Sequence, residues 1–326
     1  MTAVLAAPRR VLVRLPNWLG DVMMARPLLH ALRHAHPAAR IEVIGPPELI
    51  VLFEHEPFDE YLRSWTPIGA LPPTPGADAA VILPPSFSSA WAALRWGARA
   101  RLGFASDGRS LLLTHPWRRP ARGEMHLSRE YLALAAPLGV SEVPVPPLSL
   151  PEETRAWGRS LLERTGGVPE RWVVIGPGAI YGPAKRWPAA RFAALAGRLA
   201  GTGLEVLVCG AASDRAAADE VTRMAGPGVR SLAGETTLGV QLALCAGAVA
   251  TVCNDSGLAH VAAATGARTV VVFGSTSSAW TAPIGDDVRV VQHAPVCAPC
   301  FRRTCRIGYR CLEAVTVEEV ARCVAA

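Results

Sequence analysis

The sequence predicts an α/β protein made of two doubly wound parallel sheets that face each other across a cleft. Strand-like and helix-like segments alternate through both halves of the chain. A proline-rich passage separates the halves, and 326 residues are enough for two domains of ordinary size. Because such alternation places helices on both faces of a parallel sheet, each half is expected to form one such domain.

The first half contains short apolar runs that we interpret as strands and amphipathic runs that we interpret as helices. The strands are expected at 10–15, 40–45, 80–85 and 101–106, and the helices at 21–36, 47–55, 88–98 and 126–138. The passage VPVPPLSLP at 143–151 then suits an extended linker better than a packed element. We therefore divide the chain into domains at 1–150 and 151–326.

The second half restarts the same alternation after a helix over 153–166. Strands are expected at 172–176, 204–210, 229–234, 248–254, 268–274 and 288–293, and helices at 188–200, 213–225, 237–246 and 256–265. The last helix begins with a capping box formed by Thr316 and Glu319. Ligands of doubly wound sheets bind at the carboxyl ends of the strands, so the cleft is expected between those ends.

The composition excludes some classes of protein. No run approaches the roughly twenty apolar residues that a membrane span needs, and MTAVLAAPRR lacks the pattern of a signal peptide. We therefore expect a cytoplasmic protein. The net charge of +6 favours an anionic partner, although an ordinary soluble surface explains it equally well. The arginines are scattered, so charge alone does not argue for nucleic acid.

The loop PNWLGD at 16–21 joins the first strand to the first helix. Strand, glycine loop and helix usually cradle a phosphate on free N–H groups, but the carboxylate of Asp21 would repel one. Asp21 either caps the helix or accepts a proton from an incoming hydroxyl. Gly20 permits close approach of a ligand to the backbone, and Asn17 and Trp18 precede it. These three residues are therefore candidate ligand contacts.

A second glycine loop, GPGAIYGPAKRWP at 176–188, follows a strand and leads into a helix. Glycines expose N–H donors, and Lys185 can sit on a diphosphate as a point charge. The loop matches neither the Walker nor the GxGxxG pattern, and an ordinary solvated loop is the alternative. Gly178 and Lys185 are its candidate binding residues.

The segment CNDSGLAHVAAATG at 253–266 begins a helix at the end of a strand. The free N–H groups of Ser256, Gly257 and Leu258 are expected to point into the cleft, ready for an anionic oxygen. Asp255 starts the same turn, and the alternative is that it only caps the helix. His260 lies one turn further on and either contacts the same ligand or is an interior histidine. Glu235 is a weaker candidate, as an acceptor of hydrogen bonds from a ribose.

The chain has eight cysteines and no secretory signal, which argues against a disulfide framework. Cys209, Cys245 and Cys253 lie in apolar contexts and are expected in the core. A second group has the spacing C-x2-C-x4-C-x5-C, close enough for zinc or an iron–sulfur cluster, although it matches no common module. The group is either a set of structural metal ligands or, as we favour, a set of reduced and partly buried thiols: Cys297, Cys300, Cys305 and Cys311.

With these segments assembled, the sequence resembles the ADP-heptose:lipopolysaccharide heptosyltransferases of glycosyltransferase family 9, most closely the heptosyltransferase II branch. The segments that carry the resemblance are PNWLGDVMMARPLLHALR, GPGAIYGPAKRWP, NDSGLAHVAAATG, VVVFGSTSSAWTAPIG and CAPCFRRTCRIGYRCL. They span most of the chain in order. The resemblance implies the GT-B fold: two Rossmann-like domains, with the acceptor bound by the first and the donor nucleotide mostly by the second.

The resemblance also implies an inverting transfer of heptose from ADP-L-glycero-D-manno-heptose to the inner-core heptose of lipopolysaccharide, without a metal or another cofactor. The family's proposed base falls on Asp21, and Asn17, Trp18 and Gly20 lie on the acceptor side. Its phosphate-contacting lysine falls on Lys185, and its donor-binding turn on Asp255, Ser256, Gly257 and His260. Some relatives carry hydroxyl residues before the lysine, where this chain has Ile180 and Tyr181.

The expected partners are thus an ADP-sugar, a lipid-anchored lipopolysaccharide core and the cytoplasmic face of the inner membrane, with no nucleic acid. Transfer of another sugar or to another acceptor is an alternative within the family. A Rossmann-type oxidoreductase or nucleotide-sugar epimerase is an alternative outside it, although no GxGxxG follows the first strand. A nucleic-acid-binding module built on the cysteines would lack the interleaved aromatic residues of a single-strand binder.

Overall fold

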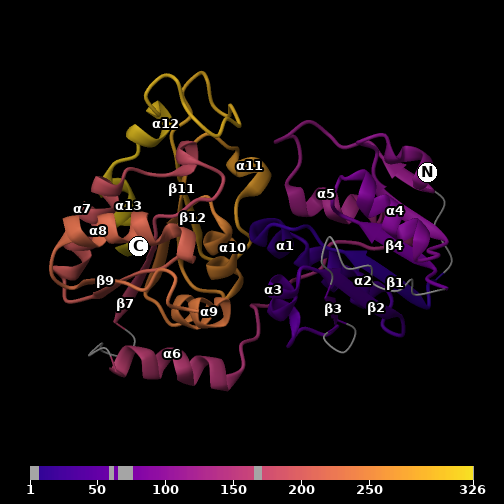
Figure 1. Cartoon of the computed structure of the whole chain (residues 1–326), viewed down its shortest axis with the longest axis horizontal. Helices are drawn as coiled ribbons and strands as arrows, with labels where there is room; N and C mark the ends of the chain where they lie inside the picture. The colour runs from indigo at the N-terminus through magenta and orange to yellow at the C-terminus, as the bar shows by residue number, and fades with distance from the viewer. Residues whose placement is uncertain (1–6, 59–61, 65–75, 165–170, 326) are drawn as a thin grey trace. The chain divides into compact units, whose positions relative to one another are not determined.

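A computed structural model describes residues 7–58, 62–64, 76–164 and 171–325. The chain divides into two compact units, Met1–Pro146 and Pro147–Ala326, which Figure 1 colours from indigo to magenta and from magenta to yellow. Within the described ranges each unit contains one sheet of six parallel strands. The expected alternation of helices with parallel strands is therefore confirmed.

The first sheet has the strand order β3-β2-β1-β4-β5-β6. Its strands are β1 (Arg10–Arg14), β2 (Arg40–Gly45), β3 (Leu62–Ser64), β4 (Ala79–Ile82), β5 (Ala100–Phe104) and β6 (His115–Trp117). The central strand β1 pairs with β2 on one side and with β4 on the other. The order reverses direction between β1 and β4, which makes the carboxyl end of this pair the topological switch point of the first sheet.

The helices of the first unit connect these strands. They are α1 (Leu19–Met24), α2 (Arg26–Ala35), α3 (Pro47–Ile50), α4 (Phe87–Arg95) and α5 (Leu127–Leu134), with short 3-10 turns η1 (Val51–Phe53), η3 (Arg109–Leu112) and η4 (Ala136–Leu138). The helix predicted over 21–36 is two helices that meet at Ala25, with Pro27 in the first turn of the second. Since proline lacks an N–H group and disturbs the turn before it, it accounts for this break.

The second sheet has the order β12-β11-β10-β7-β8-β9. Its strands are β7 (Trp172–Gly176), β8 (Glu205–Val208), β9 (Val229–Ser231), β10 (Ala250–Asn254), β11 (Thr269–Phe273) and β12 (Val288–Gln292). Read from the opposite edge, this is the same pattern as in the first sheet. The order reverses between β7 and β10, so the loops that follow these two strands lie at the second switch point.

The second unit opens with α6 (Glu152–Arg164), after the predicted linker, which has no helix or strand. Its other helices are α7 (Ala189–Ala200), α8 (Arg215–Ala225), α9 (Leu238–Ala246), α10 (Gly257–Ala264), α11 (Ser278–Thr281), α12 (Arg310–Glu313) and α13 (Val317–Ala325), and its 3-10 turns are η5 (Pro183–Lys185) and η6 (Ala212–Asp214). The predicted capping box is confirmed, because Thr316 N donates to Glu319 Oε2 and Glu319 N donates to Thr316 Oγ1.

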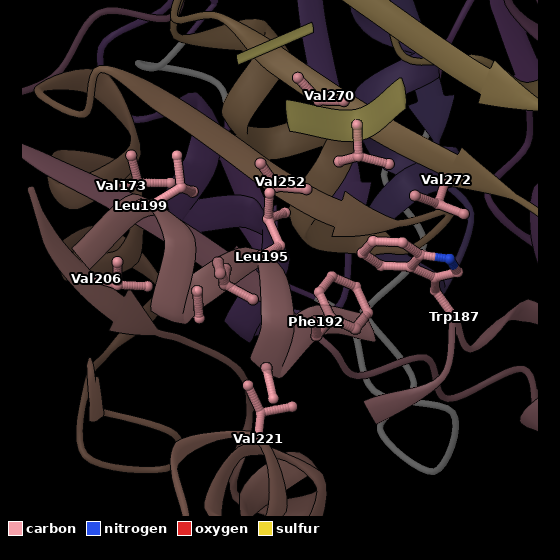
Figure 2. Packing of buried hydrophobic residues seen from close by; sticks show 14 of the residues in the cluster. Val173, Trp187, Phe192, Leu195, Leu199, Val206, Val221, Val252, Val270 and Val272 are labelled. Carbon is pink, nitrogen blue, oxygen red and sulfur yellow. The ribbon is translucent and has the colours of Figure 1, made fainter. Parts of the chain in front are cut away.

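The main core of the second unit lies between the sheet and α7, α8 and α13. Figure 2 shows valines of the strands packed against Phe192 and Leu195 of α7. Trp187 packs edge-to-face on Phe192, with ring centroids 4.9 Å apart, and is 2% exposed. This packing anchors the carboxyl end of the 176–188 loop to the core.

Among the described residues, we find no helix with the length and apolar character of a membrane span.

Candidate active site

Asp21 lies in the first turn of α1, at the switch point of the first sheet. The N-cap residue of α1 is Trp18, which is extended and makes no side-chain cap bond, so Asp21 does not itself occupy the capping position. Val22 N donates to Trp18 O over 2.9 Å and closes the first turn. This turn follows the loop after β1, so Asp21 lies at the sheet edge where ligands of doubly wound proteins bind.

The loop before Asp21 is held by Arg14 at the end of β1. Arg14 is 2% exposed and donates from Nη2 to Asn17 Oδ1 over 2.8 Å and from Nη1 to Leu15 O. Burial lowers the pKa of Arg14 to about 9, so the guanidinium is still charged at neutral pH. Asn17 is therefore fixed by its side chain, while Trp18 is 58% exposed. A lone arginine at a strand end has no sequence signal, and we did not predict its role.

Tyr131 of α5 is a buried residue whose hydroxyl pKa responds to the charge of Asp21. It is 3% exposed, and burial first and the Asp21 charge second raise the pKa of its hydroxyl well above the usual value. The phenol therefore stays protonated at neutral pH. The sequence contains no local pattern linking residues 21 and 131, so only the fold brings them together.

At the switch point of the second sheet, the structure joins two of the predicted site residues. Lys185, at the end of η5, places Nζ 2.5 Å from Asp255 Oδ2, and both side chains are largely buried. Thr276 Oγ1 donates to the same carboxylate oxygen over 2.5 Å. The loops after β7, β10 and β11 thus converge on Asp255. In this arrangement its carboxylate positions the ammonium group of Lys185.

Asn254, the last residue of β10, fixes the 176–188 loop at two points and was not among the predicted residues. It is fully buried; Nδ2 donates to Pro177 O over 2.7 Å, and Oδ1 accepts from Trp187 N over 2.9 Å. Each of these backbone groups satisfies one end of the amide. A polar residue ending an apolar strand is the signal that could have revealed it.

The cysteine-rich segment supports the same loop from its other side. Ala184 N donates to Arg303 O over 3.0 Å, and Tyr181 Oη donates to Phe301 O over 2.5 Å. Gly182 has φ +140°, and a Cβ on it would lie 2.7 Å from Arg303 O. Only glycine therefore fits at position 182 without displacing one of the two segments.

Two cationic groups lie around the ring of Tyr181. Lys185 Nζ is 4.9 Å and Arg303 Cζ is 5.5 Å from its centroid. Cation–π attraction accounts for both positions. Arg303 is the candidate site residue that sequence reasoning missed, because 118 positions in the chain separate it from Lys185.

Ser256, Gly257 and His260 lie at the start of α10, next to this cluster in the chain. Ser256 is the N-cap residue and makes no side-chain cap bond, so the first-turn N–H groups are not capped by its hydroxyl. His260 is one turn into the helix and 5% exposed. Glu235 is exposed, in the turn between β9 and α9. The roles of these four residues stay predictions.

The family model of glycosyltransferase family 9 (heptosyltransferase) matches residues 75–310. The lipopolysaccharide heptosyltransferase 2 of Escherichia coli strain K12 is 31% identical, with 87% of this chain and 88% of that protein covered. The chain belongs to glycosyltransferase family 9. The lipopolysaccharide heptosyltransferase 2 of Salmonella typhimurium is 32% identical, again with 87% of this chain and 88% of that protein covered.

Solved structures of the family share the fold of this glycosyltransferase. The E. coli ADP-heptose LPS heptosyltransferase II has a TM-score of 0.81 at 28% identity, with 97% of each chain covered. A family 9 glycosyltransferase from Veillonella parvula DSM 2008 has a TM-score of 0.86 at 21% identity, with 99% of this chain and 98% of that chain covered. The GT-B class with two Rossmann-like domains is confirmed, and family membership favours sugar transfer over the oxidoreductase and epimerase alternatives.

The proposed metal site of this glycosyltransferase is not assembled. In the ranges that the structure describes, no three His, Cys, Asp or Glu side chains are grouped so that they could hold a metal ion. Cys297 and Cys300 are exposed, and the Cys305 thiol instead accepts N–H bonds from Ile307 and Tyr309, which lower its pKa. The prediction that three further cysteines lie in the core is confirmed, because Cys209, Cys245 and Cys253 are all buried.

Gly178 is required by packing in this glycosyltransferase. A Cβ at position 178 would lie 2.2 Å from Cγ of Asp214, whose carboxylate also accepts from Ala211 N. We predict that Gly178→Ala lowers the stability of the enzyme by about 1–3 kcal/mol, as overpacking does. Thermal unfolding of Gly178→Ala, Asp214→Ala and the double variant tests this. The double variant should be more stable than the two separate losses predict, and strictly additive losses would contradict the clash.

Proposed function

We propose that this enzyme transfers heptose from ADP-L-glycero-D-manno-heptose to the inner-core heptose of lipopolysaccharide, with inversion at the anomeric carbon. The observation that carries this proposal is the resemblance to heptosyltransferase 2 over most of both chains. The Lys185–Asp255–Thr276 cluster at a nucleotide-binding switch point supports it. We place the reaction at the cytoplasmic face of the inner membrane, where a lipid-anchored acceptor is available.

In the proposed reaction, Asp21 takes the proton of an acceptor hydroxyl as its oxygen attacks the anomeric carbon of the donor. The bond from that carbon to the diphosphate oxygen breaks at the same time, so the donor's configuration inverts. Asn17, Trp18 and Gly20 contact the acceptor. The position of Asp21 at the switch point of the first sheet supports this role, because ligands of doubly wound sheets bind there and a carboxylate can accept a proton.

The departing ADP gains negative charge, which the second unit stabilises. Lys185, the N–H groups at the start of α10 and a glycine-rich loop form the proposed cradle. Ser256, Gly257 and His260 are proposed to line it, and Glu235 is proposed to bind the ribose. Fixed donors and cations of this kind do the work that a metal does in other transferases, and we propose that no metal is needed.

Lys185 is already paired with the carboxylate of Asp255. One cation against one carboxylate leaves little net positive charge for a diphosphate, so a second cation is needed nearby. We therefore propose that Arg303, on the same Tyr181 ring, also binds the diphosphate.

Arg303→Ala is expected to weaken ADP binding by roughly ten- to a hundredfold, because a charge-assisted hydrogen bond is worth about 1.5–3 kcal/mol. Binding of adenosine, which has no phosphate, should not change. Isothermal titration with both ligands measures this. Arg306→Ala removes an exposed arginine from the same segment and serves as the matched control. If both variants lose ADP affinity equally, Arg303 contributes only to the positive charge of the segment and does not contact the diphosphate.

The overall proposal is tested by incubating the purified enzyme with ADP-L-glycero-D-manno-heptose and core acceptors that carry one inner-core heptose. Mass spectrometry should show one added heptose, and the yield should not fall in EDTA. ADP-glucose and ADP-mannose, offered in parallel, test the alternative donor sugars. Transfer from one of these, with none from ADP-heptose, would overturn the donor assignment.

A further inference from the structure

We propose that the first unit docks on an anionic lipid bilayer through an apolar surface formed by α4 and the turn η3. This inference rests on the proposed function, because a lipid-anchored acceptor requires the enzyme to work at a membrane. We call the surface formed by Phe87, Trp91, Leu94 and Leu111 the α4–η3 surface. None of these residues belongs to the proposed catalytic or donor-binding machinery.

The α4–η3 surface exposes an unusual amount of apolar side chain. On α4, Phe87 is 46%, Trp91 48% and Leu94 37% exposed. Their spacing of four and three residues places them on one face of the helix. The buried side of the helix is formed by Ser89, Ala90 and Ala93, which are at most 2% exposed. The helix therefore has a core face and a second apolar stripe facing solvent.

Leu111 lies on the turn η3, which packs against α4, and it is 95% exposed. The turn that carries it is firmly held by the preceding arginine. Arg109 is fully buried and donates from Nη1 to Ser89 Oγ of α4 over 2.9 Å and to Pro84 O over 2.5 Å. Burying an exposed leucine side chain is favourable, so a leucine kept exposed on a fixed turn could gain this free energy by binding a partner. Exposed apolar groups on two elements that pack together are typical of an interaction surface.

The charges around the surface select the partner. Residues 87–122 contain seven arginines and one acidic residue, Asp107, although Arg109 is buried and Arg119 is paired with Glu130. Arg95 and Arg99 are exposed at and just after the end of α4, and Arg101 is fixed beside the turn by donating to Leu112 O over 2.6 Å. Asp107 accepts from Phe87 N over 2.7 Å at the start of α4. Apolar side chains bordered by arginines, with a tryptophan among them, match the interface of an anionic bilayer.

The topology places this surface beside the proposed acceptor residues. Helix α4 begins a few residues after β4, which pairs with β1, and the loop after β1 carries Trp18 and Asp21. Both loops leave the same edge of one parallel sheet. A bilayer bound at α4 would therefore present a lipid-anchored acceptor on the side of the first unit that carries Asp21.

Vesicle flotation tests the proposal directly. The wild-type enzyme should float with vesicles of phosphatidylglycerol and phosphatidylcholine and bind pure phosphatidylcholine at least tenfold more weakly. The double variant Trp91→Ser/Leu111→Ser should lose at least tenfold in binding to the anionic vesicles. Met224→Ser is the matched control, since Met224 is 46% exposed on α8 of the second unit. Both variants should keep wild-type activity on a soluble acceptor without lipid, which shows that they are folded.

Unchanged flotation of the double variant, or equal flotation with neutral vesicles, would overturn the proposal. So would a concentration-dependent dimer in sedimentation that the double variant abolishes without any vesicle binding, because the surface would then bind a second copy. Flotation uses no sugar donor. Lipid binding without heptose transfer would therefore refute the proposed function alone, and transfer without lipid binding would refute this inference alone.

Discussion

Replacement of Asp21 by asparagine is expected to lower kcat by about 10²–10⁴-fold, the range that a positioned general base contributes. The amide cannot take the proton of the attacking hydroxyl, but it has nearly the same size. ADP affinity should change less than twofold, since Asp21 belongs to the first unit and the proposed nucleotide cradle to the second. Steady-state kinetics with ADP-heptose and a soluble acceptor, together with ADP titration, measure both quantities.

Asn17→Ala is the matched control for the Asp21 variant. It removes a side chain from the same loop, where Asn17 Oδ1 accepts from Arg14, but no proposed proton acceptor. We expect it to raise KM for the acceptor more than it lowers kcat. If Asp21→Asn lowers ADP affinity and kcat by equal factors, or leaves kcat within tenfold of wild type, Asp21 has only a structural role in α1.

Lys185→Ala is expected to weaken ADP binding and to lower kcat by about 10²–10³-fold, as loss of one preorganised charge-stabilising group does. It should also destabilise the fold, because the buried Asp255 carboxylate would lose its cation and keep the Thr276 hydroxyl. A loss of activity in this variant alone therefore mixes two causes. ADP titration and thermal unfolding have to be measured together.

The double variant Lys185→Ala/Asp255→Asn separates the two causes. The neutral amide removes the unpaired buried charge, so the unfolding temperature should return toward the wild-type value. ADP affinity should stay low, since the cation is still missing. If ADP affinity recovers along with stability, Lys185 acts through the fold and does not contact the diphosphate.

Much of the fold could be predicted because its signals are local. Every strand expected in the second half is present within three residues at either end, and the Thr316–Glu319 capping box forms as its spacing indicated. Short elements without a clear apolar period, such as β3, β6 and α12, were not predicted. Their positions depend on pairing with neighbouring strands or on packing, which no short window of sequence contains.

The candidate site divides in the same way. Lys185 and Asp255 were predicted separately, from glycines and helix starts that follow apolar strands. Their ion pair, and the position of Thr276 on the same carboxylate, follow from the parallel order of β7, β10 and β11. For a related reason, cysteine spacing left a metal site and reduced thiols as alternatives. Sequence spacing limits how close thiols can come, but the backbone between them decides where they point.

By itself, the sequence determined the two-domain α/β architecture, the strand-end loops that carry Asp21 and Lys185, and the resemblance to a heptosyltransferase. These features depend on residue periodicity and on short contiguous motifs. Only the tertiary structure decided that Asn254 brackets the 176–188 loop, that Arg303 joins Lys185 around Tyr181, and that α4 keeps a solvent-facing apolar stripe. The physical reason is that such contacts join segments far apart in the chain, and packing sets them.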